Sequence, residues 1–122
     1  MNWSNIKHFS PDEFQCSHCG VEQMDEDFML RLDLVRDTCG FPIIITSGYR
    51  CPKHPIEAAK PGGPGPHSTG KAADLGVSFH RARALLTMVT QNFNGLGIKQ
   101  NGEAAGRFIH VDLLEPRLWT YK

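Results

Sequence analysis

The sequence has no long hydrophobic run and no excess of charge of either sign. No apolar stretch approaches the ~20 residues that a membrane-spanning helix needs, and residues 1–8 are polar and contain no signal-peptide core. Thirteen Lys and Arg residues balance thirteen Asp and Glu residues, which gives no indication of a nucleic-acid or membrane partner. We therefore expect a monomer that is synthesised in the cytoplasm without a signal peptide, so that any action outside the cell follows its release.

Cysteine is also sparse, with four residues in the chain, and without a secretion signal two disulfides are a weak interpretation. Cys16 and Cys19 form a Cys-x-x-Cys followed by glycine, which is the geometry of half a zinc knuckle. The other half of a second, structural zinc site would have to come from Cys51, Cys39, His18 or His54. Free thiols are the favoured interpretation. A redox protein is disfavoured because no βαβ pattern surrounds the pair.

The length of 122 residues predicts a single domain over residues 1–122, with one hydrophobic core. Residues 10–13 read as the start of a short helical turn, with proline at the first helical position. Residues 25–39 predict a helix, because apolar side chains recur at spacings of four, three and four, and Gly40 is well placed to end it. A second helix is expected from residue 79 to about residue 93, after a capping Ser78.

The strands are expected between these helices and after them. Residues 42–47 are rich in β-branched side chains and predict a buried strand, and residues 72–77 predict another. Residues 96–99 and 107–114 predict a hairpin, and the tail is expected to dock through Leu118 and Trp119. Residues 51–66 contain several prolines and no periodicity, which predicts a long ordered loop of functional importance. The fold class is therefore α+β, a small and mostly antiparallel sheet with two main helices.

Two segments carry the chemistry. His67 is followed seven residues later by Asp74, and His110 lies far downstream in an alternating strand pattern. Imidazole and carboxylate are both good zinc ligands, and three protein ligands with one open position are typical of a catalytic zinc site. The period of two in the last strand places His110 and Asp112 on one face and the apolar side chains on the other.

These residues belong to a wider pattern. The pattern comprises Ser-Gly-Tyr-Arg at residues 47–50, His-x-x-Gly-x-Ala-x-Asp at residues 67–74 and Phe-Ile-His-Val-Asp at residues 108–112. It resembles the zinc D-alanyl-D-alanine carboxypeptidases of peptidase family M15, and most closely the compact branch common in phages and prophages. That branch also shows a segment similar to Glu13–Gly20, and the similarity covers roughly residues 9 to 119.

The resemblance implies zinc held by His67, Asp74 and His110, with water as the fourth ligand. Arg50 matches the family arginine that binds the carboxylate or the developing oxyanion of the substrate, although a loop-bracing ion pair is the alternative. The neighbouring Ser47 and Tyr49 are further substrate-binding candidates. The implied substrates are peptidoglycan stem peptides, cut at D-Ala-D-Ala or at an L-Ala-D-acid bond, and the implied role is that of a phage or prophage endolysin.

The sequence departs from the family pattern at the general base, which peptide hydrolysis requires close to the attacking water. Arg107 and Phe108 stand where related enzymes carry a glutamate or a histidine. Asp112 is the first candidate for the base, and its alternative role is to orient a ligand imidazole. Glu103 and His80 are weaker candidates. A second departure is Gly65, which replaces a serine two residues before the first ligand.

The missing base leaves a second class of function open. The first interpretation is a zinc peptidase. The alternative is a non-catalytic module that keeps the zinc fold for cell-wall binding or for a structural role in a phage. The hedgehog signalling domain, which resembles this fold, shows that such a site can serve binding.

Overall fold

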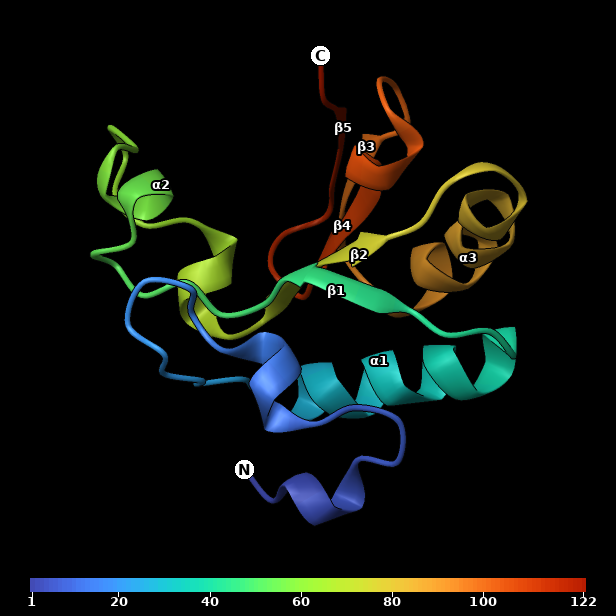
Figure 1. Cartoon of the computed structure of the whole chain (residues 1–122), viewed down its shortest axis with the longest axis horizontal. Coiled ribbons are helices and arrows are strands. Elements are labelled where there is room, and N and C mark those ends of the chain that lie inside the picture. Colours follow the sequence, from blue (N-terminus) through green and yellow to red (C-terminus); the bar gives the residue numbers. More distant parts are fainter.

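The computed structural model describes residues 1–122 and has one mixed sheet at its centre (Figure 1). The strands, in spatial order, are β1 (Ile44–Ser47), β2 (Ala72–Gly76), β4 (Phe108–Asp112), β3 (Gly95–Lys99) and β5 (Arg117–Thr120). Every neighbouring pair is antiparallel except β3 and β5, which run parallel. The α+β class with a mostly antiparallel sheet is therefore confirmed, as is the hairpin of β3 and β4.

Two long helices, α1 (Glu26–Cys39) and α3 (Phe79–Asn92), pack against each other and against one face of the sheet (Figure 1). The Asp25 side chain caps α1 by accepting a hydrogen bond from the backbone N–H of Phe28 at 3.0 Å. Gly40 ends α1 in the left-handed conformation with φ of +76°, as predicted. None of the helices combines the length and the apolar character that a membrane-spanning segment requires.

The hydrophobic core lies between these helices and the sheet. Helix α1 contributes Phe28, Leu32 and Val35, and the facing side of β2 contributes Ala73 and Leu75. The remaining core positions on the sheet and on α3 include Leu96, Ile109, Val111, Ala82, Leu85 and Val89. Because side chains alternate across a strand, this packing leaves the opposite face of β2 and β4 for Asp74, His110 and Asp112.

Three expectations about the elements need correction. Strand β1 is not buried, because it forms one edge of the sheet and Ile44 is 67% exposed. The loop at residues 51–66 contains one helical turn, α2 (Pro55–Ala58), with His54 as its cap. The tail forms a fifth strand, β5, and Leu118 points into solvent instead of docking, since it is 71% exposed.

Candidate metal centre

The pairing of the strands places the candidate ligands in one row across the sheet. Asp74 on β2 lies directly opposite His110 on β4, His110 lies opposite Gly97 on β3, and Gly97 lies opposite Trp119 on β5. A Cβ atom at Gly97 would lie 2.5 Å from the Trp119 indole, so this glycine makes room for the ring. The Trp119 ring in turn lies 5.1 Å from the His110 ring.

His67 completes the group from outside the sheet. It lies in the 3-10 turn η3 (Pro66–Thr69), and its Nδ1 lies 2.8 Å from the carbonyl oxygen of Gly48. That carbonyl can only accept, so Nδ1 carries a proton, and Nε2 is the nitrogen that faces Asp74 and could bind a metal. Nε2 lies 3.3 Å from Asp74 Oδ1, and His110 Nδ1 lies 2.9 Å from the same oxygen. All three ligand atoms lie within 4.8 Å of one another.

Burial and charge favour a metal ion at this point. His67, Asp74 and His110 are each at most 6% exposed, and buried charged groups of this kind need partners or a metal. Burial would raise the pKa of Asp74, but the hydrogen bonds with His110 and His67 hold it well below its usual range. The carboxylate is therefore ionised at neutral pH. Two imidazoles and one carboxylate form a donor set that suits zinc.

Asp112 lies on the far side of His110 from Asp74. Its Oδ2 is 2.8 Å from His110 Nε2 and 2.7 Å from the guanidinium of Arg117, and the residue is fully buried. Burial would raise the pKa of Asp112, but the hydrogen bonds from His110 and Arg117 lower it. A carboxylate that is buried, has a lowered pKa and is already paired is a poor proton acceptor for a water molecule. The geometry favours the alternative role, in which Asp112 orients the ligand imidazole.

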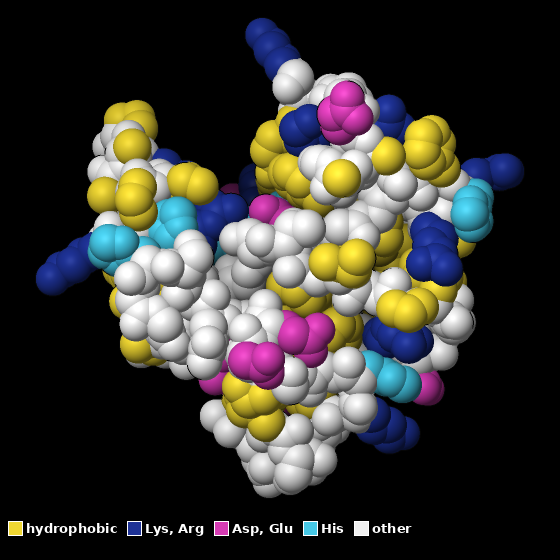
Figure 2. Space-filling view, in the orientation of Figure 1, with side chains coloured by type: hydrophobic (Ala, Val, Ile, Leu, Met, Phe, Trp, Pro, Cys, Tyr) yellow, Lys and Arg dark blue, Asp and Glu magenta, His cyan; other side chains and the backbone are white.

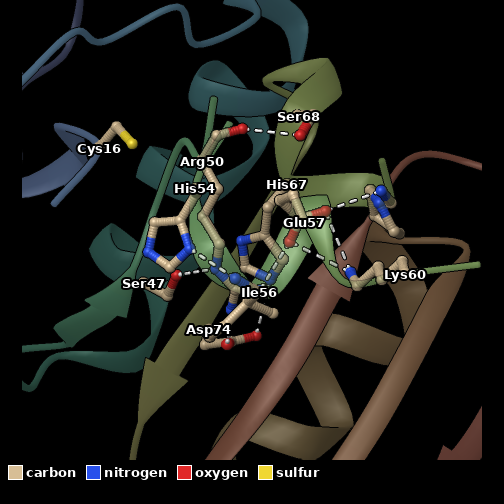
Figure 3. Close-up of polar contacts among 12 residues, drawn as sticks. Cys16, Ser47, Arg50, His54, Ile56, Glu57, Lys60, His67, Ser68 and Asp74 are labelled. Carbon is tan, nitrogen blue, oxygen red and sulfur yellow. Dashed lines mark hydrogen bonds and ion pairs between the residues drawn. The ribbon is translucent and has the colours of Figure 1, made fainter. Parts of the chain in front are cut away.

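Arg50 lies on the other side of the ligand group, and its guanidinium makes three contacts (Figure 3). Nε donates to Ser47 Oγ at 2.9 Å, one terminal nitrogen donates to Glu57 at 2.9 Å, and the other lies 3.4 Å from Asp74 Oδ2. The loop-bracing ion pair considered for Arg50 is therefore present. Arg50 also lines the pocket above the ligands, so the brace and a substrate contact are compatible.

Glu57 is the anchor of the loop that forms this wall. Its side chain is fully buried and accepts hydrogen bonds from Arg50, from Lys60 at 3.1 Å and from the backbone N–H of Gly65 at 2.7 Å. A Cβ atom at Gly65 would lie 2.5 Å from Lys60 Nζ. The glycine that departs from the family pattern thus accommodates the lysine and supplies its own N–H to the carboxylate.

The ligands form the floor of a pocket of about 320 Å³. Figure 2 shows the molecule hollowed at this place, between the loop that carries α2 and the ends of the strands. The loop side of the pocket is formed by Arg50, Ile56, Lys60 and Pro66, and the strand side by Phe108, Trp119 and Tyr121. One wall is therefore cationic and the other aromatic.

The structure does not bring every candidate to this pocket. Tyr49, a substrate-binding candidate, is 6% exposed, packs in the core and does not line the pocket. Ser47 touches the site through Arg50. Glu103 and His80 are exposed, and neither lines the pocket. Arg107 turns away from the ligands, because its guanidinium donates to the Gly102 carbonyl.

Lys60, Trp119 and Tyr121 line the pocket. Glu57, Arg117 and the ring-accommodating Gly97 contact residues around it. None of these six was among the site residues that the sequence predicted. The tail carried a usable signal, because Arg117, Trp119 and Tyr121 alternate with Leu118 and Thr120 in the period of a strand. The two glycines at residues 95 and 97 show the same period. They lie on the face of β3 where a side chain would collide with Asp112 or Trp119. Nothing in the sequence marks Glu57.

A family model described as Peptidase M15 matches residues 7–112, which is most of the chain and includes all three candidate ligands. A comparison with curated proteins gives no match.

Proposed function

The chain belongs to peptidase family M15, and from this premise we propose that it cleaves peptide bonds in the stem peptides of peptidoglycan, at D-Ala-D-Ala or at an L-Ala-D-acid bond. Membership of the family supports a zinc metallopeptidase, and the group of His67, Asp74 and His110 fits a metal site. The observation that carries the proposal is the convergence of these three buried ligand atoms at the floor of a pocket.

The donor set fits zinc, which when bound would polarise the scissile carbonyl and lower the pKa of a water molecule. The residues of the chain have supporting roles. The carbonyl of Gly48 holds His67 in one tautomer, and Asp112 holds His110 through its other nitrogen. Arg50 supplies a fixed positive charge beside Asp74, where the carboxylate or the developing oxyanion of a substrate would be stabilised.

The two walls of the pocket suit an acidic peptide. Arg50 and Lys60 place two cationic groups on one side, and a stem peptide carries both a terminal carboxylate and the carboxylate of its acidic residue. Phe108, Trp119 and Tyr121 offer an aromatic surface on the other side, against which the peptide backbone and its small side chains can pack. We further propose, from the resemblance to the compact phage branch, a role in lysis after release from the cytoplasm.

The test is hydrolysis of purified peptidoglycan with and without a chelator, with the products identified by mass spectrometry. We expect release of D-Ala or of a cleaved stem peptide, loss of that release with chelator, and its recovery when zinc is added back. The matched variants are His67→Ala, which removes a candidate ligand, and His80→Ala, which removes an exposed histidine outside the pocket. Activity that survives in His67→Ala would contradict the assigned centre.

A non-catalytic wall-binding module is the second candidate, and one observation favours it. Apart from Asp74, no carboxylate lines the pocket, and the remaining histidines there are the two candidate ligands. The protein would then bind peptidoglycan without cutting it. Co-sedimentation of the zinc-loaded protein with intact peptidoglycan, without release of any fragment, would support this function and contradict the peptidase.

A further inference from the structure

Three of the four cysteines lie together, away from the pocket. The thiol sulfur atoms of Cys16, Cys19 and Cys51 all lie within 4.8 Å of one another. All are free thiols, with Cys16 buried at 2% exposure and Cys19 open to solvent. Cys39 is not part of the group, because its sulfur donates instead to the carbonyls of Arg36 and Phe41.

The backbone around Cys16 has the form of a metal-binding knuckle. The N–H of Gly20 donates to the carbonyl of Cys16 at 2.8 Å, and Gly20 takes the left-handed conformation with φ of +75°. From the other segment, the N–H of Cys51 donates to the sulfur of Cys16 at 3.3 Å. Tetrahedral zinc with Zn–S bonds of about 2.3 Å would place the sulfur atoms about 3.8 Å apart. The observed group needs little closure to reach that spacing.

The position of Cys16 also suits a thiolate, which is the form that binds metal. At Cys19, by contrast, a backbone hydrogen bond from Val21 would lower the pKa, but the neighbouring thiols of Cys51 and Cys16 raise it. Burial would raise the pKa of the Cys16 thiol, but hydrogen bonds from the backbone of Cys51, Cys19 and His18 lower it to about 7. A buried thiol surrounded by N–H donors suits a negative charge better than an inert packing role. The geometry and this electrostatic environment point to the same ligand.

We propose that Cys16, Cys19 and Cys51 form a second zinc site, structural in role and separate from the centre at His67, Asp74 and His110. His54 is an unsuitable fourth ligand. Its Nδ1 accepts a hydrogen bond from the N–H of Ile56 at 3.1 Å, so the proton is on Nε2, which lies 3.0 Å from Ser17 Oγ. His18 and Cys19 are both exposed, so His18 or water takes the fourth position.

The second site lies where it would fix the first. Cys51 follows Arg50 directly, and the carbonyl of Gly48 holds His67 at 2.8 Å. The N–H of Tyr49 donates to the carbonyl of Phe14 at 3.0 Å, two residues before Cys16. Zinc at the cysteines would therefore clamp residues 14–19 to residues 48–51, the segment that orients both a candidate ligand and the cationic wall.

Metal content tests the proposal without reference to activity. Protein prepared without a histidine tag should contain two zinc ions per chain by mass spectrometry of the metal. Cys16→Ser, Cys19→Ser and Cys51→Ser should each contain one, and Cys39→Ser, the matched control, should keep two. His67→Ala should also contain one. A wild-type content of one zinc that is unchanged in the cysteine variants would overturn the second site.

A second measurement does not depend on the folding of cysteine variants. In His67→Ala the remaining zinc should lie only at the cysteines, so X-ray absorption should show a sulfur shell at about 2.3 Å. A shell of nitrogen and oxygen alone would overturn the proposal. So would a thiol titration of the unfolded protein that finds two of the three cysteines joined in a disulfide. Neither result depends on peptidoglycan hydrolysis, so the second site and the proposed function can fail separately.

Discussion

The floor of the pocket and its loop wall are held by different kinds of interaction. On the floor, Asp74 and His110 are placed by the pairing of β2 with β4, where backbone hydrogen bonds fix the position of each side chain. The wall at residues 51–66 has only one helical turn, and it is held by the side chain of Glu57. The floor is thus specified by a repeating backbone pattern, whereas the wall rests on a single buried carboxylate and its partners.

The largest expected effect comes from removing a ligand at the floor. His67→Ala should weaken zinc binding at this centre by more than about 100-fold, beyond the 10–100-fold that loss of a supporting contact usually costs. The expected cause is the loss of one of three donor atoms that lie within 4.8 Å of one another. Competition with a chelator of known affinity measures it. His80→Ala serves as the control, and equal weakening in both variants would show that the effect is not specific to the site.

The next effect concerns the wall. Glu57→Gln should lower the free energy of unfolding by about 3 kcal/mol, because it leaves Lys60 without its counter-charge and Arg50 with only its longer contact to Asp74. This is the lower end of the usual range, since Lys60 is 36% exposed and partly solvated. Urea unfolding measures it, with Glu103→Gln as an exposed control of equal charge change. A difference under about 0.5 kcal/mol between the two variants would show that the wall has another anchor.

A variant at Asp112 distinguishes a role in orienting a metal ligand from a role as the general base. If Asp112 orients His110, Asp112→Asn should lower zinc affinity by about 10–100-fold, while the rate per zinc-loaded molecule changes little. If Asp112 is the general base, the same variant should keep its zinc and lose hydrolysis. Zinc titration and hydrolysis at saturating zinc, carried out on one preparation, distinguish the two roles.

The smallest effect is the pH dependence of stability in the metal-free protein. The pKa of Asp112 is lowered from an ordinary 3.8 in the folded protein. Its contribution to the free energy of unfolding is therefore complete above pH 3.8 and is lost as the pH falls through the lowered pKa of the folded state. The pKa of His110 is raised from an ordinary 6.5 in the folded protein. Its contribution to the free energy of unfolding is therefore complete below pH 6.5 and is lost as the pH rises through the raised pKa of the folded state. Together, Asp112 and His110 favour a maximum in the stability of the metal-free protein between pH 3.8 and 6.5.

Unfolding of the metal-free protein by urea across this pH range tests that expectation. In Asp112→Asn the decline on the acidic side should be shallower, because a neutral amide does not titrate. A wild-type profile that rises steadily from pH 4 to pH 8 would show that other groups control the pH dependence.

The sequence predicted the floor of the pocket better than its loop wall, because strand pairing leaves a periodic pattern in the sequence and a single buried side chain does not. Strand alternation predicted that His110 and Asp112 share a face, and these two side chains are hydrogen-bonded in the structure. The fifth strand was missed because β5 pairs in parallel with β3. Parallel strands are not joined by a short turn, so the sequence carries no hairpin signal at this place. Glu57 was missed because it lies in a loop without periodicity, and nothing local distinguishes a buried carboxylate there from an exposed one.

The ligands of the floor also link the fold to the supply of metal. Asp74 and His110 are 36 residues apart in the chain and meet only through the pairing of β2 with β4. A metal ion held there therefore binds the native state and has no matching site in the unfolded chain. By mass action, free metal at a hundred times the dissociation constant would stabilise the native state by about 2.7 kcal/mol. The population of native molecules would then rise and fall with the concentration of available zinc.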